Sequence, residues 1–520
     1  MKLVTSEIMR GLDKKALEFG IESIILMENA GRSVYQAIIK DFKNNADKGV
    51  VVFSGKGNNG GDGFVTARYL INNGFETDVV FLGDPGELSD DAKANHTALS
   101  RITEHIHYIN STDELKSLGI NIKERGLVVD ALLGTGIKGD VKVLYMEIIN
   151  MINESGLPVV SVDIPSGVDA DSGQVLGTAV RAKKTVTFGL AKIGLVVHPG
   201  CEHAGDLEVA DISIPKRLID SISVPYNLVT HKLVGSMFKP RGLSTNKGDY
   251  GHVLVIGGSQ GKSGSVILAA KAALRAGSGL VTVSGPEGLM PIFESTVTEA
   301  LKEPLNETLE GFIARSAIEQ VDKLMQTSDV VALGPGMGTE KETIDFVHNL
   351  LDRCKIPMVI DADGINIIAH NPDVLLSRGR EDLVLTPHPG EFGRLVNMHA
   401  HEINKDRIRL SSDFAKRYRC TLVLKGAKTV IAAKNGDVWV NPTGNPGMAT
   451  GGMGDVLTGL ISGLIAIGLT TENAAIAGVF IHGMAGDMIY AYRKNSAILA
   501  GDLLDRIPYV ISNLNECPSL

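Results

Sequence analysis

Short apolar runs that end in glycine or an acidic residue, and that alternate with helical segments, constrain the fold of this chain most strongly. Strands covered by crossover helices on both faces have this continuous apolar pattern, whereas half-exposed strands alternate between apolar and polar residues. The runs cover residues 50–53, 77–82, 126–129, 157–162, 252–256, 280–284, 330–333, 357–360, 383–385 and 421–424. Helices are expected over 6–19, 23–40, 64–72, 266–276 and 456–513, and two or three further strands within 178–210. The sequence therefore predicts an α/β protein with parallel sheets.

A break in this alternation divides the chain. Pro215, Pro225 and Pro240 fall in residues 214–240, a stretch with few periodic apolar positions. Stretches of this kind are common between domains. Because the motifs on its two sides differ in residues and spacing, we expect two unlike three-layer αβα domains, covering residues 1–220 and 228–515.

The composition restricts the class of function. Of 520 residues, 44% are hydrophobic and 21% charged, and the net charge is −9 without a lysine–arginine stripe. This balance argues against binding to nucleic acid or to a membrane surface. The four cysteines are scattered and the N-terminus lacks an apolar signal core, so a reduced, cytoplasmic location is expected. The most apolar stretch, residues 456–469, is shorter than a membrane span and is expected to be a buried helix.

Polar residues gather at three predicted strand ends of the first domain. The sequence SGKGNNGGDG (54–63) follows the first run and opens a helix, while DALLGTG (130–136) and DIPSGVD (163–169) follow two others. The carboxyl ends of parallel strands converge on one crevice, so Asn59, Asp130, Asp163 and Ser166 are expected to meet there. Their oxygens suit an alkali or alkaline-earth cation better than zinc. A turn role alone for Asp130 and Asp163 is the alternative.

The combination of GNNGGDG, VDALLGTG and VDIPSGVD resembles the YjeF N-terminal domain, the Rossmann-like epimerase of hydrated nicotinamide cofactors. The resemblance implies a potassium ion among Asn59, Asp130 and Ser166. Epimerisation at C6 of the hydrated ring requires loss and return of the hydroxyl, or an equivalent proton relay, so Asp163 is the candidate acid/base. Lys192 matches a family position and either assists or is merely solvated. The implied substrate contacts are Asn58, Asn59, Gly60, Gly61, Asp62, Gly134, Thr135, Gly136, Ile137, Lys138, Gly139, Asp140 and Asp163.

The second half carries a phosphate-binding signal in NPTGNPGMATGGMGD (441–455), which is followed by an apolar helix. Backbone N–H groups of such a turn point inward, and the helix N-terminus adds about half a positive charge, which suits a phosphoryl group. Asp455 at the lip of this turn is placed to take a proton from a hydroxyl that attacks phosphorus. A helix cap is the alternative role for Asp455.

Four further segments end predicted strands of the same half: residues 334–338, 361–366, 385–391 and 425–429. Each is expected at the crevice of the second sheet. His388 alone is more often a satisfied turn residue than a catalytic one, and Asp361 and Asp363 fit helix caps equally well. The run Gly261-Lys262-Ser263 is not a Walker A motif, because Ile256 stands where that motif requires glycine.

Together with the glycine-rich turn, these segments resemble the YjeF C-terminal domain of the ribokinase-like superfamily, the ADP- or ATP-dependent dehydratase of the S form of hydrated NADH and NADPH. The implied hydrated-cofactor contacts are Ser265, Gly336, His388 and Asp455, although the family usually has alanine where Ser265 stands. The implied adenine-nucleotide contacts are Lys425, Gly426, Ala427, Lys428, Thr429 and Gly454. Asp455 would deprotonate the ring hydroxyl as it attacks the terminal phosphate, and elimination of phosphate would restore the dihydropyridine.

The two resemblances predict a bifunctional repair enzyme that interconverts the R and S hydrates and dehydrates the S form. The expected cofactors are K⁺ in the first domain and Mg²⁺ with ADP or ATP in the second, with ADP favoured. We expect small-molecule substrates, no nucleic-acid or membrane partner, and a homo-oligomer. The alternatives are a small-molecule kinase of the thiazole or pyrimidine type and a nucleotide-sensing or protein-binding module on an inactive scaffold.

Overall fold

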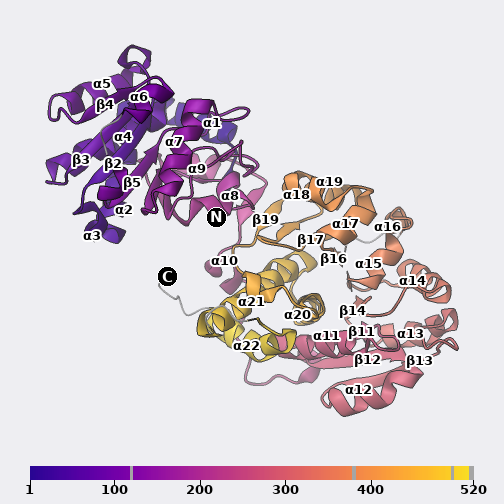
Figure 1. Ribbon diagram of the computed structural model, residues 1–520. Helices are drawn as coiled ribbons and strands as arrows, with labels where there is room; N and C mark the ends of the chain where they lie inside the picture. The colour runs from indigo at the N-terminus through magenta and orange to yellow at the C-terminus, as the bar shows by residue number, and fades with distance from the viewer. Residues whose placement is uncertain (118–120, 378–381, 494–496, 515–520) are drawn as a thin grey trace. The chain divides into compact units, whose positions relative to one another are not determined.

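The chain forms two compact units, residues 2–226 and the residues from Asn227 onward (Figure 1). The computed structural model describes residues 1–117, 121–377, 382–493 and 497–514. We call the two parts the N-terminal unit and the C-terminal unit. The boundary between them falls within the proline-containing stretch 214–240.

The N-terminal unit is built on a parallel sheet with the strand order β4-β3-β2-β5-β6-β7-β9. Its strands are β2 (Val50–Gly55), β3 (Thr77–Leu82), β4 (Ile106–Ile109), β5 (Leu127–Ala131), β6 (Val159–Val162), β7 (Lys184–Phe188) and β9 (Asp206–Ala210). Two short strands, β1 (Leu3–Val4) and β8 (Ala191–Lys192), pair separately. The sheet therefore contains the runs that the sequence predicts as buried strands.

Helices cover both faces of this sheet. On one face Val50 and Val52 join a core with α1 (Ser6–Glu18), α2 (Ser23–Asp41), α4 (Asn58–Asn72) and α5 (Asp90–Ser100). On the other face Val51 and Phe53 pack with α7 (Val143–Glu154). The remaining helices are α3 (Lys43–Ala46), α6 (Thr112–Lys116), α8 (Gly200–Ala204) and α9 (Lys216–Ser221). The alternation of core residues along β2 gives the predicted three layers.

The helix after β2 begins earlier than the sequence indicates. We expected it over residues 64–72, after the glycine-rich segment, but α4 begins within that segment at Asn58. The glycines allow close packing within the helix: a Cβ on Gly60 would lie 1.7 Å from the carbonyl oxygen of Gly55. The glycine-rich segment is thus the first turns of a helix that lies tightly against the strand before it.

The C-terminal unit contains a sheet with the order β10-β19-β18-β17-β16-β15-β14-β11-β12-β13. Its strands are β10 (Tyr226–Leu228), β11 (His252–Ile256), β12 (Leu280–Pro286), β13 (Leu301–Leu305), β14 (Val330–Leu333), β15 (Met358–Ile360), β16 (Leu383–Leu385), β17 (Thr421–Leu424), β18 (Val430–Ala432) and β19 (Val438–Val440). In the order in which they lie in the sheet, β13, β12, β11, β14, β15, β16 and β17 pair parallel with their neighbours. The pairs β17–β18 and β18–β19 are antiparallel. The α/β prediction with parallel sheets is confirmed, and the antiparallel extension was not predicted.

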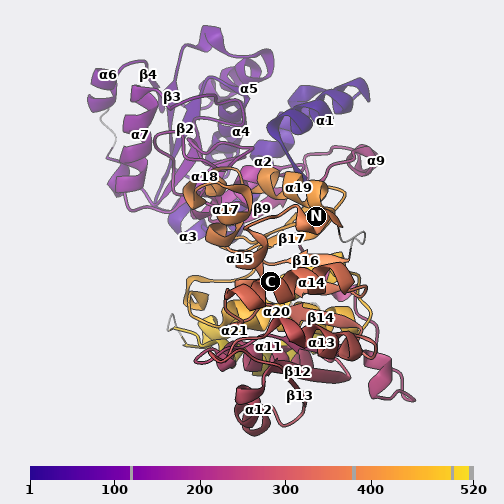
Figure 2. The ribbon, with the colours of Figure 1, turned by 90° about the vertical axis from the view of Figure 1, so that its right-hand side faces the viewer.

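Helices lie on both faces of the second sheet as well. Figure 1 shows α11 (Ser263–Ala276), α20 (Met453–Ala466), α21 (Thr471–Arg493) and α22 (Ala500–Asn513) on one face, where they share one core with β11. The other face carries α13 (Ile318–Met325), α14 (Lys341–Arg353), α15 (Asp363–Ile368) and α17 (Pro389–Val396). Figures 1 and 2 place α12 (Met290–Thr296) beside the edge strand β13. The C-terminal unit also contains α10 (His231–Gly235), α16 (Val374–Ser377), α18 (Ala400–Lys405) and α19 (Arg407–Tyr418).

The apolar stretch at residues 456–469 forms most of α20, whose residues Val456 to Ile465 are buried. This confirms the expected buried helix. In the described residues one helix, α21, has the length and composition of a membrane span, and 67% of its most apolar window is buried within the structure. The predicted helical region 456–513 comprises α20, α21 and α22, and its residues 494–496 lie outside the described residues.

Candidate active sites

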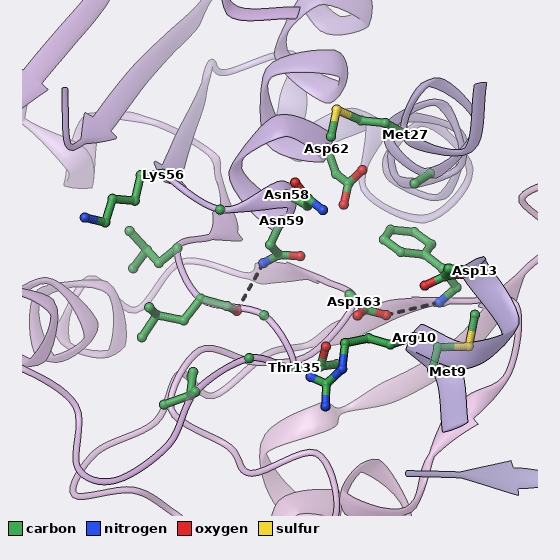
Figure 3. Close-up of a pocket in the computed structure, with 18 of the residues that line it drawn as sticks. Met9, Arg10, Asp13, Met27, Lys56, Asn58, Asn59, Asp62, Thr135 and Asp163 are labelled. Carbon is green, nitrogen blue, oxygen red and sulfur yellow. Dashed lines mark hydrogen bonds between the residues drawn. The ribbon is translucent and has the colours of Figure 1, made fainter. Parts of the chain in front are cut away.

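A cavity of about 710 Å³ opens at the carboxyl ends of the N-terminal strands (Figure 3). It lies where the strand order reverses, between β2 and β5, which is the usual ligand crevice of such sheets. Its walls include the predicted residues Asn58, Asn59, Asp62, Gly134, Thr135, Gly136, Ile137, Lys138, Asp140 and Asp163. Gly60, Gly61 and Gly139 do not line the cavity.

A buried ion pair lies in this cavity. Lys192 Nζ donates to Asp163 Oδ1 at 2.5 Å, and Thr187 Oγ1 donates to the same oxygen at 3.0 Å. Asp163 has a left-handed φ of 63°, which turns its side chain at the end of β6. Lys192 is 1% exposed, so the alternative of a solvated lysine is wrong. The pair supplies a carboxylate and an ammonium group side by side.

The predicted potassium ligands come together through one loop. Ser166 Oγ donates to Asp130 Oδ1 at 2.5 Å, and Asp130 Oδ2 accepts from the Ser166 amide at 2.9 Å. Asn59 Nδ2 donates to the carbonyl of Leu133, and the Leu133 amide donates to Ser166 Oγ. Asp130 is fully buried, and burial raises its pKa, although the hydrogen bonds that it accepts lower the pKa in part. These contacts give Asp130 more than a turn role.

The donor set at this loop fits a monovalent cation. Asn59 Oδ1 is buried and has no hydrogen-bond partner in the part of the chain that the structure describes. A buried carbonyl-type oxygen without a partner is costly, and a hard cation would satisfy it. The carboxylate of Asp130 and the hydroxyl of Ser166 complete a set of hard oxygens.

In the C-terminal unit, Asp455 lies in the first turn of α20. The helix has Gly452 at its N-cap position with a left-handed φ of 87°, and no side chain caps it. The cap alternative for Asp455 is therefore wrong. Burial raises the pKa of Asp455 to about 6, with Asp361 adding to the effect and a hydrogen bond from Ser265 opposing it. Such a carboxylate is poised to accept a proton near neutral pH.

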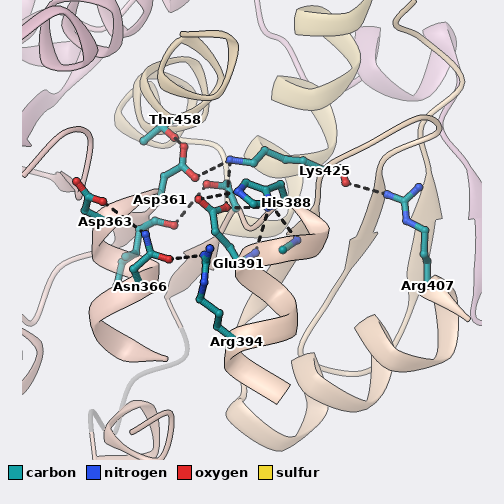
Figure 4. Close-up of polar contacts among 12 residues, drawn as sticks. Asp361, Asp363, Asn366, His388, Glu391, Arg394, Arg407, Lys425 and Thr458 are labelled. Carbon is teal, nitrogen blue, oxygen red and sulfur yellow. Dashed lines mark hydrogen bonds and ion pairs between the residues drawn. The ribbon is translucent and has the colours of Figure 1, made fainter. Parts of the chain in front are cut away.

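Figure 4 shows a polar network that includes Asp361, Lys425, Thr458 and Glu391. The charges of Asp361 and Lys425 act on Asp455. Lys425 Nζ donates to Asp361 Oδ1 at 2.7 Å and Thr458 Oγ1 donates to Asp361 Oδ2 at 2.7 Å. Lys425 Nζ is 3.8 Å from Glu391 Oε2. Burial is the largest single effect on the pKa of Lys425 and lowers it. The negative charges of Asp361 and Glu391 act in the opposite direction, and the pKa is raised overall. Asp361 is 1% exposed and follows β15, so it serves this network rather than a helix cap.

Gly454 is packed directly against this network. A Cβ on Gly454 would lie 3.2 Å from Lys425 Nζ and 3.3 Å from Asp361 Oδ2. The ammonium group therefore lies under the first turn of α20, next to Asp455. The resemblance implies that Lys425 and Gly454 both contact the adenine nucleotide, and the two residues are neighbours in the structure.

The other predicted residues of this site have identifiable partners. His388 Nδ1 accepts from the amides of Gly390 and Glu391 at the start of α17, which is a helix-capping role. Gly336 has a φ of 63° and lies against Ser265. Asp363 Oδ2 accepts from the Gly338 amide at 2.9 Å. Thr458 was not predicted as a site residue, because it acquires its neighbours only through the fold. Glu391 ends a segment that was expected at the crevice, but it was given no role there.

The loop 425–429 is shaped by a residue that the sequence did not single out. Arg407, at the start of α19, donates to the carbonyls of Leu424, Lys425 and Ala427. Lys428 has a left-handed φ of 53° and donates to the carbonyl of Pro442. The loop is therefore held in one shape from both sides.

Comparisons with known proteins cover both units. The family model for the YjeF-related protein N-terminus matches residues 23–194, and the model for NAD(P)H-hydrate dehydratase matches residues 253–509. The bifunctional NAD(P)H-hydrate repair enzyme of Moorella thermoacetica is 44% identical over 99% of this chain and 98% of its own length. The chain belongs to the family of bifunctional NAD(P)H-hydrate repair enzymes.

Two further relatives carry the same family name. The enzymes of that name from Thermofilum pendens and Escherichia coli are 37% and 33% identical over 99% and 97% of this chain, and 97% and 93% of their own lengths. A solved ADP/ATP-dependent NAD(P)H-hydrate dehydratase from Bacillus subtilis is 27% identical, covers 56% of this chain and 99% of its own, and has a TM-score of 0.47. The predicted family is confirmed, and the relatives do not favour the thiazole or pyrimidine kinase.

Proposed function

We propose that the chain carries out the two reactions of its family at the two sites described above. The epimerase domain spans residues 1–220 and uses the N-terminal cavity. The dehydratase domain spans residues 228–515 and uses the first turn of α20. The observation that supports the proposal is the proximity of Asp455, Gly454 and the Lys425–Asp361 pair at the N-terminal turn of α20, where a carboxylate, backbone N–H groups and an ammonium group come together.

In the dehydratase domain, Asp455 takes the proton of the ring hydroxyl as that oxygen attacks the terminal phosphate of ADP or ATP, and AMP or ADP leaves. The N–H groups of residues 451–454 and the ammonium group of Lys425 stabilise the charge that develops on the phosphoryl oxygens. In the resulting ester, phosphate is a better leaving group than hydroxide. The ring nitrogen then expels phosphate to give an iminium ion, and loss of a proton from C5 restores the dihydropyridine.

Magnesium is expected to enter this site with the nucleotide. Both carboxylate oxygens of Asp361 already accept hydrogen bonds from Lys425 and Thr458, so the donor phosphates and water are the expected principal ligands. Magnesium bound to those phosphates would neutralise part of their charge. The proposed nucleotide contacts remain Lys425, Gly426, Ala427, Lys428, Thr429 and Gly454, and the hydrated cofactor is expected at Ser265, Gly336, His388 and Asp455.

In the epimerase domain, Asp163 transfers protons to and from the oxygen on C6 of the hydrated ring, and Lys192 orients its carboxylate. Potassium bound by Asn59, Asp130 and Ser166 would fix the loop that follows β5 at the edge of the cavity. The unpartnered Asn59 oxygen supports this site. Replacing K⁺ with a large organic cation should slow exchange of the R and S hydrates without affecting dehydration of the S form.

Absorbance of the reduced nicotinamide ring tests the dehydratase. The full-length protein with the S hydrate of NADH, Mg²⁺ and ADP should restore that absorbance, and ATP in place of ADP gives the donor preference, which we expect to favour ADP. The Asp455→Asn variant should be slower by about 100-fold or more. No recovery with either nucleotide, or an unaltered rate in the variant, would contradict the proposal.

The remaining expectations concern the cellular setting. The net charge of −9 and the small-molecule cavity support a protein without nucleic-acid or membrane partners. The scattered cysteines support a cytoplasmic location. A homo-oligomer remains a prediction, which light scattering of the purified protein would check.

A further inference from the structure

Helix α1 contributes to the epimerase cavity although it lies outside the matched family region. The family model begins at residue 23, whereas α1 covers Ser6–Glu18. Four residues of this helix, Met9, Arg10, Asp13 and Leu17, line the cavity. Asp13 is the acidic residue among them, and neither the motifs nor the proposed function gives it a role.

One oxygen of the Asp13 carboxylate is buried and has no hydrogen-bond partner among the described residues. Asp13 Oδ1 is inaccessible to solvent and receives no hydrogen bond from any described residue. Figure 3 shows Asp13, Asp62 and Asp163 around the same space, each from a different element. Burial raises the pKa of Asp13 to about 6; the charge of Lys192 opposes that rise and the charge of Asp163 adds to it. An acceptor left unsatisfied in a ligand cavity indicates a partner that the substrate brings.

The reaction requires two proton-transfer groups. When the C6–O bond breaks, the hydroxyl must gain a proton to leave as water, and the ring nitrogen supplies its lone pair to C6. When water adds to the opposite face of C6, it must lose a proton and the lone pair returns to nitrogen. One carboxyl group on one side of the ring does not reach both oxygens, so Asp163 needs a counterpart.

We propose that Asp13 is this counterpart, a second catalytic residue of the epimerase that acts together with Asp163. In one direction Asp13 gives its proton to the departing hydroxyl, the C6–O bond breaks, and the Asp163 carboxylate takes a proton from the water that adds on the other face. The reverse direction exchanges the two roles. The inference rests on the proposed location of the epimerase site in this cavity.

The active form of this pair holds one proton between the two carboxyl groups. The charged or titratable groups that face Asp13 are Lys192, Asp163 and Asp62 from other elements, together with Arg10 on α1. Because burial raises the pKa of Asp13 while the Asp163 carboxylate is paired with Lys192 at 2.5 Å, the shared proton resides on Asp13 and is lost as the pH rises. Epimerisation should therefore slow as the pH rises above about 6.

Exchange of the R and S hydrates of NADH, followed by chiral separation, tests the proposal in the full-length protein. Asp13→Asn should slow the exchange by about 100-fold or more. Dehydration of the S form by the same preparation should be unchanged, which reports that the chain is folded and active elsewhere. Asp13→Glu should recover part of the exchange rate and keep the fall above about pH 6. Glu18→Gln, an exposed charge change on the same helix, should leave exchange unaltered.

Two outcomes would overturn the assignment. One is an Asp13→Asn rate within about three-fold of the unaltered protein while Asp163→Asn is slow, which would move the second proton transfer to another group such as Asp62. The other is equal loss in Asp13→Asn and Asp13→Glu with the pH profile unchanged, which would indicate a structural role. If Asp163→Asn also exchanges normally, the proposed site itself is wrong.

Discussion

At the scale of single residues, the charges around Asp455 determine the pH at which this proposed base is ionised. Its carboxylate is buried next to Asp361, whose negative charge raises its pKa, while Lys425 and Ser265 oppose this effect. Because a base must be ionised to accept a proton, dehydration should be lost as the pH falls through about 6.

Asp361→Asn tests this coupling. Removing the negative charge should move the half-maximal pH of kcat/KM for S-hydrate dehydration lower by about one unit. The maximal rate should also fall, because Lys425 loses its partner at 2.7 Å. Asp505→Asn, a surface residue paired with Arg275, provides the control and should leave the profile unchanged. An unshifted profile in Asp361→Asn would contradict the proposed influence on Asp455.

The sequence predicted the residues at strand ends, because acidic and glycine residues after apolar runs mark the crevice of a parallel sheet. It did not predict the partners of those residues. Thr458 and Lys425 reach Asp361 from positions 97 and 64 residues away, and this proximity depends on which strands become neighbours. Asp13 escaped notice for the same reason, since it belongs to an ordinary amphipathic helix.

At the scale of elements, the two glycine-rich helix starts are used differently. In α4 the glycines have no side chains, so the helix can approach β2, and it begins at Asn58, ahead of the expected start at residue 64. In α20 the left-handed Gly452 turns the chain into the helix, and Gly454 makes room for Lys425. Glycine content alone does not distinguish a helical turn from a loop. Either can contain glycine where the backbone lies too close to a neighbouring group for a Cβ atom.

The packing of α20 on α11 gives a prediction about the position of Asp455. A Cβ on Gly459 would lie 1.9 Å from the carbonyl oxygen of Ala269, so Gly459→Ala must move one helix away from the other. Overpacking of this kind costs about 1–3 kcal/mol in the free energy of unfolding. Dehydration should slow as well, because the displaced helix carries Asp455.

Gly501→Ala is the matched control for this substitution. Gly501 lies in α22, and a Cβ there would have no neighbour within 4 Å. Its replacement should leave dehydration unchanged and stabilise the helix by about 0.4–1 kcal/mol. Chemical denaturation of both variants checks the free energies, and equal stability of the two would contradict the close packing of α11 and α20.

At the scale of the whole molecule, the two units divide one task between them. The C-terminal site is specific for the S hydrate in this proposal, and the N-terminal cavity supplies that form from the R hydrate. Each unit has its own sheet and core, so a substitution at one site should leave the chemistry at the other intact. The family relationship alone does not show that the two sites act independently. A kinetic experiment with a mixture of R and S hydrates would test this.

Asp163→Asn should separate the two activities in one time course. With a mixture of R and S hydrates, ADP and Mg²⁺, the unaltered protein should restore the absorbance of the entire mixture, because the R form is converted as the S form is consumed. The variant should restore the S fraction at the normal rate and then slow by about 100-fold or more for the R fraction. Lys192 would remain buried without its carboxylate partner at 2.5 Å, so Asp163→Asn with Lys192→Met should recover stability but not exchange. A single fast phase in Asp163→Asn would show that the R form reaches the dehydratase by another route.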